Sequence, residues 1–224
     1  MIWYGRLLSQ RSAVLHGFTG KRNGAGESLD LGSGRNPEAW AAASSAIGAA
    51  GWPVAWLQQV HGDRVRQVSV PGFQGEGDAL VTDKPGILLA VRIADCVPIL
   101  VAGDGIVAAI HAGWRGLGAG IVEATLRVLG DRGPFAAVVG PAICGTCYEV
   151  GKEVVDVLAG RAATEVFVTR QRHVDLGALA VHILERAGVE TERIAVCTRC
   201  GVGLHSHRRD GEAAGRQAGF VGLR

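Results

Sequence analysis

The chain has 224 residues, of which 48% are hydrophobic and 20% charged, and its formal net charge is +2. A chain this apolar can bury enough surface to fold, which excludes an intrinsically disordered protein. The small net charge gives no reason to expect nucleic acid or a membrane surface as the partner. The length favours one domain over two, so we expect a single domain that spans residues 1–224.

The N-terminal stretch and the cysteines indicate the compartment. Arg6 and Arg11 interrupt the first apolar residues, so this stretch is predicted to be neither a signal peptide nor a membrane span. The five cysteines are an odd number in a chain with no secretion signal, which favours reduced thiols or metal ligands over a disulfide framework. We therefore expect a cytoplasmic protein.

Apolar periodicity predicts four helices and a larger number of strands. The helices are expected at residues 38–50, 118–129, 152–158 and 176–187, the last with Asp175 as its N-cap. The strands are expected at residues 54–60, 65–70, 79–82, 87–93, 97–102, 106–110, 136–139, 166–169 and 193–197. Several of them are joined by turns too short for a crossover helix. The sheet must therefore contain antiparallel pairs and is not a purely parallel one.

The segment ADCVPILVAGDGIVAAIHAGWRGL, residues 94–117, carries the first candidate site. Its Gly103-Asp104 pair suits a two-residue type II′ hairpin loop, and this register places Cys96 opposite His111. Side chains paired in this way lie close enough to share a metal ion or exchange a proton. The alternative is a buried structural cysteine beside a hydrogen-bonded histidine. Pro98 argues against a strand here unless the strand lies at a sheet edge.

A third residue that could bind the metal lies at the end of another predicted strand. In the segment LQQVHGD, His61 stands at the end of an apolar run and directly before a Gly-Asp turn. One cysteine and two histidines suit zinc, and three protein ligands leave the fourth position open, as in catalytic zinc sites. The sequence therefore favours His61, Cys96 and His111 as one metal-binding set.

The glycine-rich run HAGWRGLGAG leads from this site into the predicted helix IVEATLRVL. We expect His111 and Arg115 to lie beside a helix N-terminus, where free N–H groups favour an anion such as phosphate. The glycine spacing matches neither the dinucleotide-binding nor the P-loop pattern, so the alternative is close strand-to-helix packing.

Six motifs together resemble one known family. They are QQVHGDRV, GDALVT, ADCVPIL, AAIHAGWRGLGAGIVEAT, GPAICGTCYEVG, and SHRRDG followed by AGR. In type, order and spacing they are similar to the YfiH family, formerly called multicopper polyphenol oxidases or laccases and now associated with purine nucleoside phosphorylase activity. The resemblance implies an α/β (α+β) single domain of mixed β-sheets flanked by helices. It also implies one zinc ion held by His61, Cys96 and His111.

The resemblance implies substrates as well. The family is described as cleaving adenosine, inosine, guanosine and methylthioadenosine with phosphate, and as deaminating adenosine, so the expected partners are purine nucleosides and phosphate. The candidate phosphate ligands are cationic: Lys21, Arg22, Arg115, Arg208, Arg209 and Arg216. The alternative for each is surface pairing with Asp210 or Glu212. Leu204 and His205 stand where aromatic residues are common in the family, so base binding there would differ.

Two other enzyme classes are alternatives. A cysteine hydrolase would use Cys96 as nucleophile and His111 as base, and would need no metal. A copper-dependent, laccase-like polyphenol oxidase would need a large histidine set with several H-x-H pairs. This chain has seven histidines and one such pair, His205 with His207. Zinc is therefore the expected cofactor and copper the alternative.

The remaining cysteines suggest a third rival, a zinc-stabilised binding module. Cys144-Gly-Thr-Cys147 and Cys197-Thr-Arg-Cys200 are two CxxC pairs, but 49 residues lie between Cys147 and Cys197. This gap gives no compact zinc knuckle. We predict that the two pairs do not form a second, tetrathiolate site.

Overall fold

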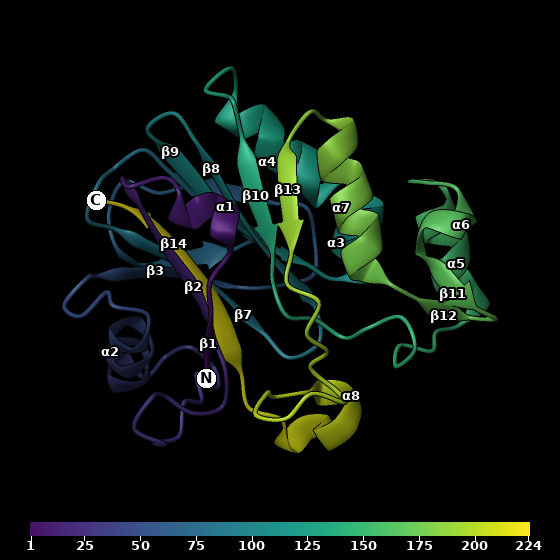
Figure 1. Cartoon of the computed structure of the whole chain (residues 1–224), viewed down its shortest axis with the longest axis horizontal. Coiled ribbons are helices and arrows are strands. Elements are labelled where there is room, and N and C mark those ends of the chain that lie inside the picture. The colour runs from purple at the N-terminus through teal and green to yellow at the C-terminus, as the bar shows by residue number, and fades with distance from the viewer.

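Two six-stranded mixed sheets form the centre of the molecule in the computed structural model, which describes residues 1–224 (Figure 1). The first sheet, in spatial order, contains β1 (Ile2–Trp3), β2 (Val14–Thr19), β14 (Gln217–Leu223), β7 (Leu88–Ile93), β3 (Val54–Gln58) and β5 (Gly72–Glu76). The second contains β13 (Glu190–Arg193), β10 (Ala136–Val139), β8 (Val97–Gly103), β9 (Ile106–Ala112), β6 (Ala79–Thr82) and β4 (Val65–Gln67). A small third sheet pairs β11 (Val168–Arg170) with β12 (His173–Val174).

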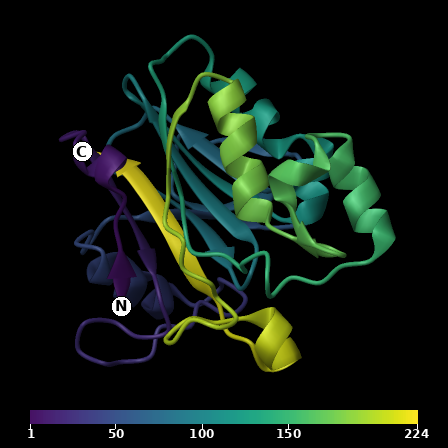
Figure 2. The ribbon, with the colours of Figure 1, turned by 45° about the vertical axis from the view of Figure 1, so that its right-hand side comes forward.

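Helices cover the outer faces of both large sheets (Figure 2). The helices of the whole chain are α1 (Arg6–Ser9), α2 (Pro37–Ala46), α3 (Trp114–Ala119), α4 (Ile121–Leu129), α5 (Lys152–Ala159), α6 (Thr164–Phe167), α7 (Leu176–Arg186) and α8 (His207–Asp210), with a 3-10 turn at Gly211–Ala213. Helix α2 packs on the first sheet, and α4 and α7 pack on the second. None of the helices combines the length and apolar character needed to span a bilayer.

Alternating side chains on the central strands explain this four-layer arrangement. Leu89 and Leu100 lie in the core between the two sheets, whereas Leu88 faces α2 and Ile99 faces the layer of α4 and α7. Strands that are buried on both faces need apolar residues at every position, which is why β8 has the continuous sequence VPILVAG. The predicted fold class, a single domain of mixed sheets flanked by helices, is confirmed.

Several element boundaries differ from the prediction for local reasons. Strands β6 and β10 coincide with the predicted ranges, and the Asp175 side chain caps α7 by accepting a hydrogen bond from the Ala178 N–H. The helix predicted over residues 38–50 ends at Ala46, and Gly48 follows with a φ of 82°. In the strand predicted over 166–169, the first residues belong to α6. The strand predicted over 193–197 is shifted toward the N-terminus, as β13.

The predicted hairpin register is wrong by two residues. The loop is Asp104-Gly105, with Gly105 at a φ of 60°, so His111 pairs with Pro98 and not with Cys96. A shift of two residues keeps each side chain on the same face, so His111 still points where the prediction placed it. Strand β8 is also interior and not an edge, with Pro98 as its second residue. The Pro98 carbonyl accepts a hydrogen bond from the Gly140 N–H.

The helix predicted over residues 118–129 is two helices. Gly120 has a φ of 92°, which ends α3 and begins α4. A helix N-terminus does follow His111 and has Arg115 in its first turn, as predicted, but it belongs to the short helix α3 with its N-cap Gly113, and not to the longer helix α4. The sequence prediction also missed β14, because Gly219 and Gly222 lower its strand propensity. A Cβ at Gly222 would lie 2.7 Å from the Ile87 carbonyl oxygen, so close strand approach requires glycine there.

Candidate functional site

The structure brings His61, Cys96 and His111 together from three different elements. His61 follows β3, Cys96 precedes β8, and His111 lies in β9. One ligand-type atom from each lies within 4.8 Å of the others, and the two imidazole rings meet edge to face. A thiol and two imidazoles form a donor set that fits zinc, with three protein ligands and one open position. This cluster could therefore bind a metal ion.

Two unusual backbone conformations and one glycine allow the three side chains to lie close together. His61 has a φ of 62°, and Asp95, just before Cys96, has a φ of 101°. Non-glycine residues rarely occupy this left-handed region, and such strain is concentrated at functional sites. A Cβ at Gly113 would lie 3.0 Å from Cδ2 of His61 and 3.2 Å from Sγ of Cys96. Glycine at position 113 therefore leaves the room that the cluster needs.

Asp78 organises two of the three candidate ligands. Its fully buried carboxylate accepts hydrogen bonds from the backbone N–H groups of His61 and Gly62, at 2.9 and 2.8 Å, and lies 2.8 Å from Nδ1 of His111. An ionised carboxylate can only accept a hydrogen bond, so Nδ1 of His111 carries a proton, and Nε2 is the nitrogen that offers its lone pair once the imidazolium loses its second proton. Such carboxylate–histidine pairs orient metal ligands in many proteins.

The charges of the cluster are strongly coupled. Burial raises the pKa of the Cys96 thiol, but His111 and His61 outweigh this effect and lower it to about 6. Burial lowers the pKa of His111, but the Cys96 thiolate and the Asp78 carboxylate outweigh this effect and raise it to about 9. Without a metal, the pair is therefore a thiolate and an imidazolium near neutral pH.

Four arginines surround the cavity into which the cluster opens. This cavity has a volume of about 530 Å³. It is lined by Gly32, Gln59, His61, Arg92, Ile93, Ala94, Asp95, Cys96, His111, Trp114, Arg115, Tyr148, His207, Arg208 and Arg216. The Arg115 guanidinium lies over the Trp114 ring at 4.3 Å and makes no hydrogen bond to the protein. Burial and then the charge of Arg216 lower the pKa of Arg92. An anion in this cavity would relieve the repulsion between these cations.

One wall of the cavity is built around Arg208. Its guanidinium lies 4.8 Å from the centre of the Tyr148 ring and donates to the Glu149 carbonyl oxygen at 2.7 Å. Asp95 fixes the backbone beneath it by accepting hydrogen bonds of 2.6 Å from the Arg208 N–H and from the Thr198 hydroxyl. The wall therefore joins three segments that are distant in the sequence.

The predicted cationic ligands separate into two groups. Arg115, Arg208 and Arg216 line the cavity, whereas Lys21, Arg22 and Arg209 do not. Lys21 lies 3.7 Å from the Asp210 carboxylate. Arg22 donates to the Gly26 carbonyl oxygen. The Arg209 guanidinium pairs with Asp210 and donates to the carbonyl oxygens of Thr198, Arg199 and Leu204, which gives it a structural role.

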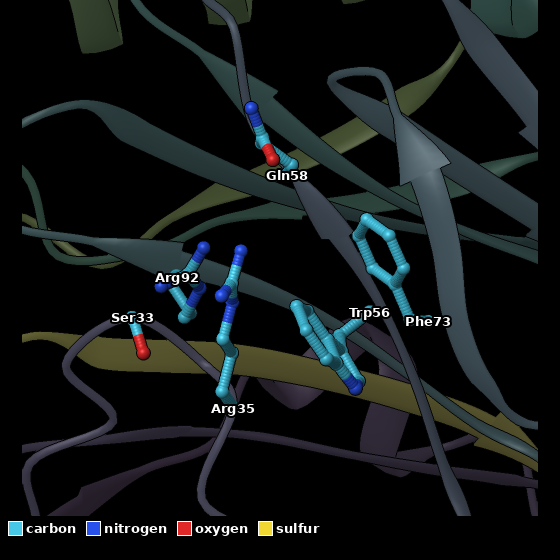
Figure 3. Close-up of a pocket in the computed structure, with 6 residues that line it drawn as sticks. All are labelled: Ser33, Arg35, Trp56, Gln58, Phe73 and Arg92. Atoms are coloured by element: carbon cyan, nitrogen blue, oxygen red, sulfur yellow. The ribbon is translucent and has the colours of Figure 1, made fainter.

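Three residues of this site were missed from the sequence: Asp78, Arg92 and Tyr148. Arg92 did leave a signal, because a charged residue inside the apolar strand LLAVRI is rarely buried without a specific role. It also lines a second, adjoining cavity with Ser33, Arg35, Gln58 and the rings of Trp56 and Phe73 (Figure 3). The two ring centroids lie 4.7 Å apart and present aromatic surface beside the guanidinium groups.

The two CxxC pairs are not separated as predicted. Cys144, Cys147, Cys197 and Cys200 form a second cluster whose sulfur atoms all lie within 4.8 Å of one another. The 49-residue gap, which was the reason for predicting no tetrathiolate site, therefore does not keep the pairs apart in space. Parallel pairing of β10 with β13 aligns the segments that follow these strands, and a bridge between Ala142 and Cys197 extends this alignment.

The fold and the first cluster together define an α/β protein with a Cys/His metal-type site beside a cationic cavity. The chain belongs to the family described as multi-copper polyphenol oxidoreductase laccase, whose model matches residues 16–224. The resemblance to the YfiH family is thereby confirmed.

Relatives and solved structures agree with this membership. A purine nucleoside phosphorylase of Deinococcus radiodurans is 38% identical over 94% of this chain and 90% of its own length. One of Streptomyces coelicolor is also 38% identical, over 97% of this chain and 100% of its own. The crystal structure of Bacillus licheniformis YfiH superposes with a TM-score of 0.84 at 27% identity, covering 94% of this chain and 93% of that one. YlmD of Geobacillus stearothermophilus gives a TM-score of 0.82 at 28% identity, covering 95% and 93%.

Proposed function

We propose that this chain is a zinc-containing purine nucleoside phosphorylase. It would cleave adenosine, inosine, guanosine and methylthioadenosine with phosphate, giving the free base and the corresponding ribose 1-phosphate, and residues 1–224 would act as one domain. The observation that carries the proposal is a Cys/His cluster that opens into a cavity lined by four arginines. The names of relatives that match nearly the whole chain support the same class of reaction.

His61, Cys96 and His111 would hold the zinc ion. When bound, zinc supplies a Lewis acid that activates water near neutral pH. Asp78 would keep the Nε2 lone pair of His111 directed at the ion by holding the proton on Nδ1. A multicopper centre fits poorly, because this cluster has two histidines and the other metal-type cluster has none.

The arginines would bind phosphate. Arg115 has donors free for a ligand, and Arg92, Arg208 and Arg216 add positive charge around the same cavity. An oxygen of hydrogen phosphate held here would attack the anomeric carbon of the ribose while the bond to the purine nitrogen breaks, and the proton of the hydrogen phosphate would pass to the departing purine. Lys21, Arg22 and Arg209 have no part in this proposal, because they lie outside the cavity.

Adenosine deamination is proposed as a second activity of the same site. It needs water, the purine base and the Cys/His cluster, but not the phosphate ligands. The two activities should therefore respond differently to loss of an arginine. We also propose that the protein works in the cytoplasm, because its five cysteines are free thiols.

The test is to incubate purified protein with each nucleoside, with and without phosphate, and to separate the products by chromatography. Base release that depends on phosphate supports phosphorolysis. Base release that ignores phosphate means hydrolysis, and no turnover of any purine nucleoside would overturn the proposed class. Cys96→Ala protein, with folding checked by circular dichroism, is the matched inactive control.

The geometry also favours a second candidate, a cysteine hydrolase. The Cys96 sulfur lies within 4.8 Å of a His111 ring nitrogen, and His111 lowers the pKa of Cys96, as for an activated thiol nucleophile beside its base. A hydrolase of this kind would keep its activity after chelation of the metal. The proposed phosphorylase would lose it and recover it with added zinc.

A further inference from the structure

We propose that Cys144, Cys147, Cys197 and Cys200 bind a second zinc ion as a closed, structural tetrathiolate site. The four sulfur atoms all lie within 4.8 Å of one another. In a tetrahedral site with Zn–S bonds of ~2.3 Å, the sulfurs lie roughly 3.8 Å apart. The four sulfur atoms of this structure would therefore need to move only slightly closer together to bind zinc. Four thiolates complete the coordination of zinc and leave no open position, which assigns this ion a structural role.

The backbone around the cluster has the features of two zinc-binding turns. The N–H of Cys147 donates to the Cys144 carbonyl oxygen at 2.9 Å, and that of Gly201 donates to the Cys197 carbonyl oxygen at the same distance. Each CxxC segment therefore turns tightly. A Cβ at Gly145 would lie 2.4 Å from Cγ2 of Thr169, so glycine lets the first of these segments pack closely against β11.

Hydrogen-bond donors lie where a tetrathiolate needs them. The Cys144 N–H donates to Sγ of Cys197 at 3.3 Å, and the Thr146 hydroxyl lies 3.2 Å from Sγ of Cys144. Four thiolates and one Zn²⁺ carry a net charge of −2, and two arginines lie in the neighbouring backbone network. Arg199 donates to the Cys147 carbonyl oxygen, and Arg209, which also pairs with Asp210, donates to the Arg199 carbonyl oxygen. Such surrounding groups tune and stabilise metal sites.

The site would join the two loops that build the Arg208 wall of the cavity. Figure 1 shows the chain after β13 running down toward α8, and the bridge from Ala142 to Cys197 places the segment after β10 beside it. Cys147 directly precedes Tyr148, whose ring contacts Arg208. Thr198, between the cysteines of the second pair, donates to Asp95. A bound zinc ion would therefore hold Tyr148 and Arg208 in place without touching a substrate.

Metal analysis tests the proposal independently of catalysis. Protein purified with reductant and without chelators should contain two zinc ions per chain, and Cys96→Ala and Cys200→Ser proteins should each contain one. Cobalt(II) added to metal-stripped Cys96→Ala protein should give the intense charge-transfer absorption of a tetrathiolate, and the further substitution Cys200→Ser in the same protein should strongly reduce it. Thermal unfolding of Cys96→Ala protein should shift to lower temperature when zinc is removed, because a structural ion binds only the folded state.

Two results would overturn the proposal. One is folded, reduced Cys96→Ala protein that contains no zinc and whose four remaining thiols all react with a thiol reagent. The other is pairing of these cysteines as disulfides in protein kept under reductant. Neither depends on the Cys200→Ser variant, so a folding defect in that variant does not blur the test. Loss of nucleoside cleavage with both zinc ions retained would instead count only against the proposed enzyme function.

Discussion

The carboxylate of Asp78 lies 2.8 Å from Nδ1 of His111, and the same carboxylate accepts the backbone N–H groups of His61 and Gly62. One buried acid thus orients a ligand in β9 and the loop that carries a second ligand. Burial raises the pKa of Asp78, but hydrogen bonds from His111, Gly62 and His61 outweigh this effect and lower it. The carboxylate therefore stays ionised throughout the neutral range.

Asp78→Asn should weaken zinc binding at the Cys/His cluster by roughly 10- to 100-fold, as expected for loss of a carboxylate that orients a metal-bound histidine. The amide is similar in shape, but it is uncharged and has one acceptor oxygen in place of two, so it stabilises the proton on Nδ1 of His111 less and sets an NH2 group against a backbone N–H. Competition with a chromophoric chelator measures the affinity, with the partly exposed Asp83→Asn as control. Unchanged affinity in Asp78→Asn would show that Asp78 does not support the metal.

The Cys96 thiol in metal-stripped protein should ionise with a midpoint near pH 6, the pKa to which His111 and His61 lower it. A lowered thiol pKa means that the reactive thiolate persists above that pH and is lost as the pH falls below it. Alkylation rates of the Cys96 peptide, followed by mass spectrometry from pH 4 to 9, give the midpoint. His111→Ala should move the midpoint upward, and an unshifted profile would contradict the coupling.

Arg208→Ala should raise the phosphate KM of nucleoside cleavage by roughly 10- to 100-fold, the size of lost charge-assisted hydrogen bonds. Adenosine deamination should change much less, because it needs no phosphate. Arg22→Ala is the matched control, since Arg22 lies outside the cavity. Equal losses of both activities in Arg208→Ala would point to a general disturbance of the cavity wall.

Leu100→Ala should lower the free energy of unfolding by about 2–5 kcal/mol. Leu100 is completely buried between the two sheets, so its removal leaves a cavity that the strands cannot close. Val202→Ala, at a position that is 88% exposed, should change the stability by no more than about 0.5 kcal/mol. Denaturant unfolding of both variants checks the difference. If Leu100→Ala and Val202→Ala proteins had similar free energies of unfolding, Leu100 would not lie in a core between the two sheets.

The strands and the Cys/His cluster could be predicted because their signals are local, whereas the full fold class came from the resemblance to the YfiH family. Apolar runs mark strands, and His61, Cys96 and His111 are metal-ligand types at strand ends. The wrong hairpin register still placed Cys96 and His111 on one face, because a slip of two residues preserves side-chain direction.

The features that could not be predicted from the sequence depend on how strands far apart in the sequence pair with one another. Asp78 meets His111 only because β6 and β9 lie side by side. The cysteine pairs meet because β10 and β13 are parallel neighbours, so distance along the chain was a poor guide to distance in space. Strand β14 was missed because its glycines serve close packing against Phe18 and the Ile87 backbone, which propensity does not register.

The most direct test of the proposed function is phosphorus NMR of a reaction that contains adenosine, phosphate and the zinc-loaded protein. The account predicts that the phosphate signal falls while a ribose 1-phosphate signal rises, with one sugar phosphate formed for each adenine released. Cys96→Ala protein should give neither product. Adenine released without any new phosphate ester, or no release of base at all, would contradict phosphorolysis by this site.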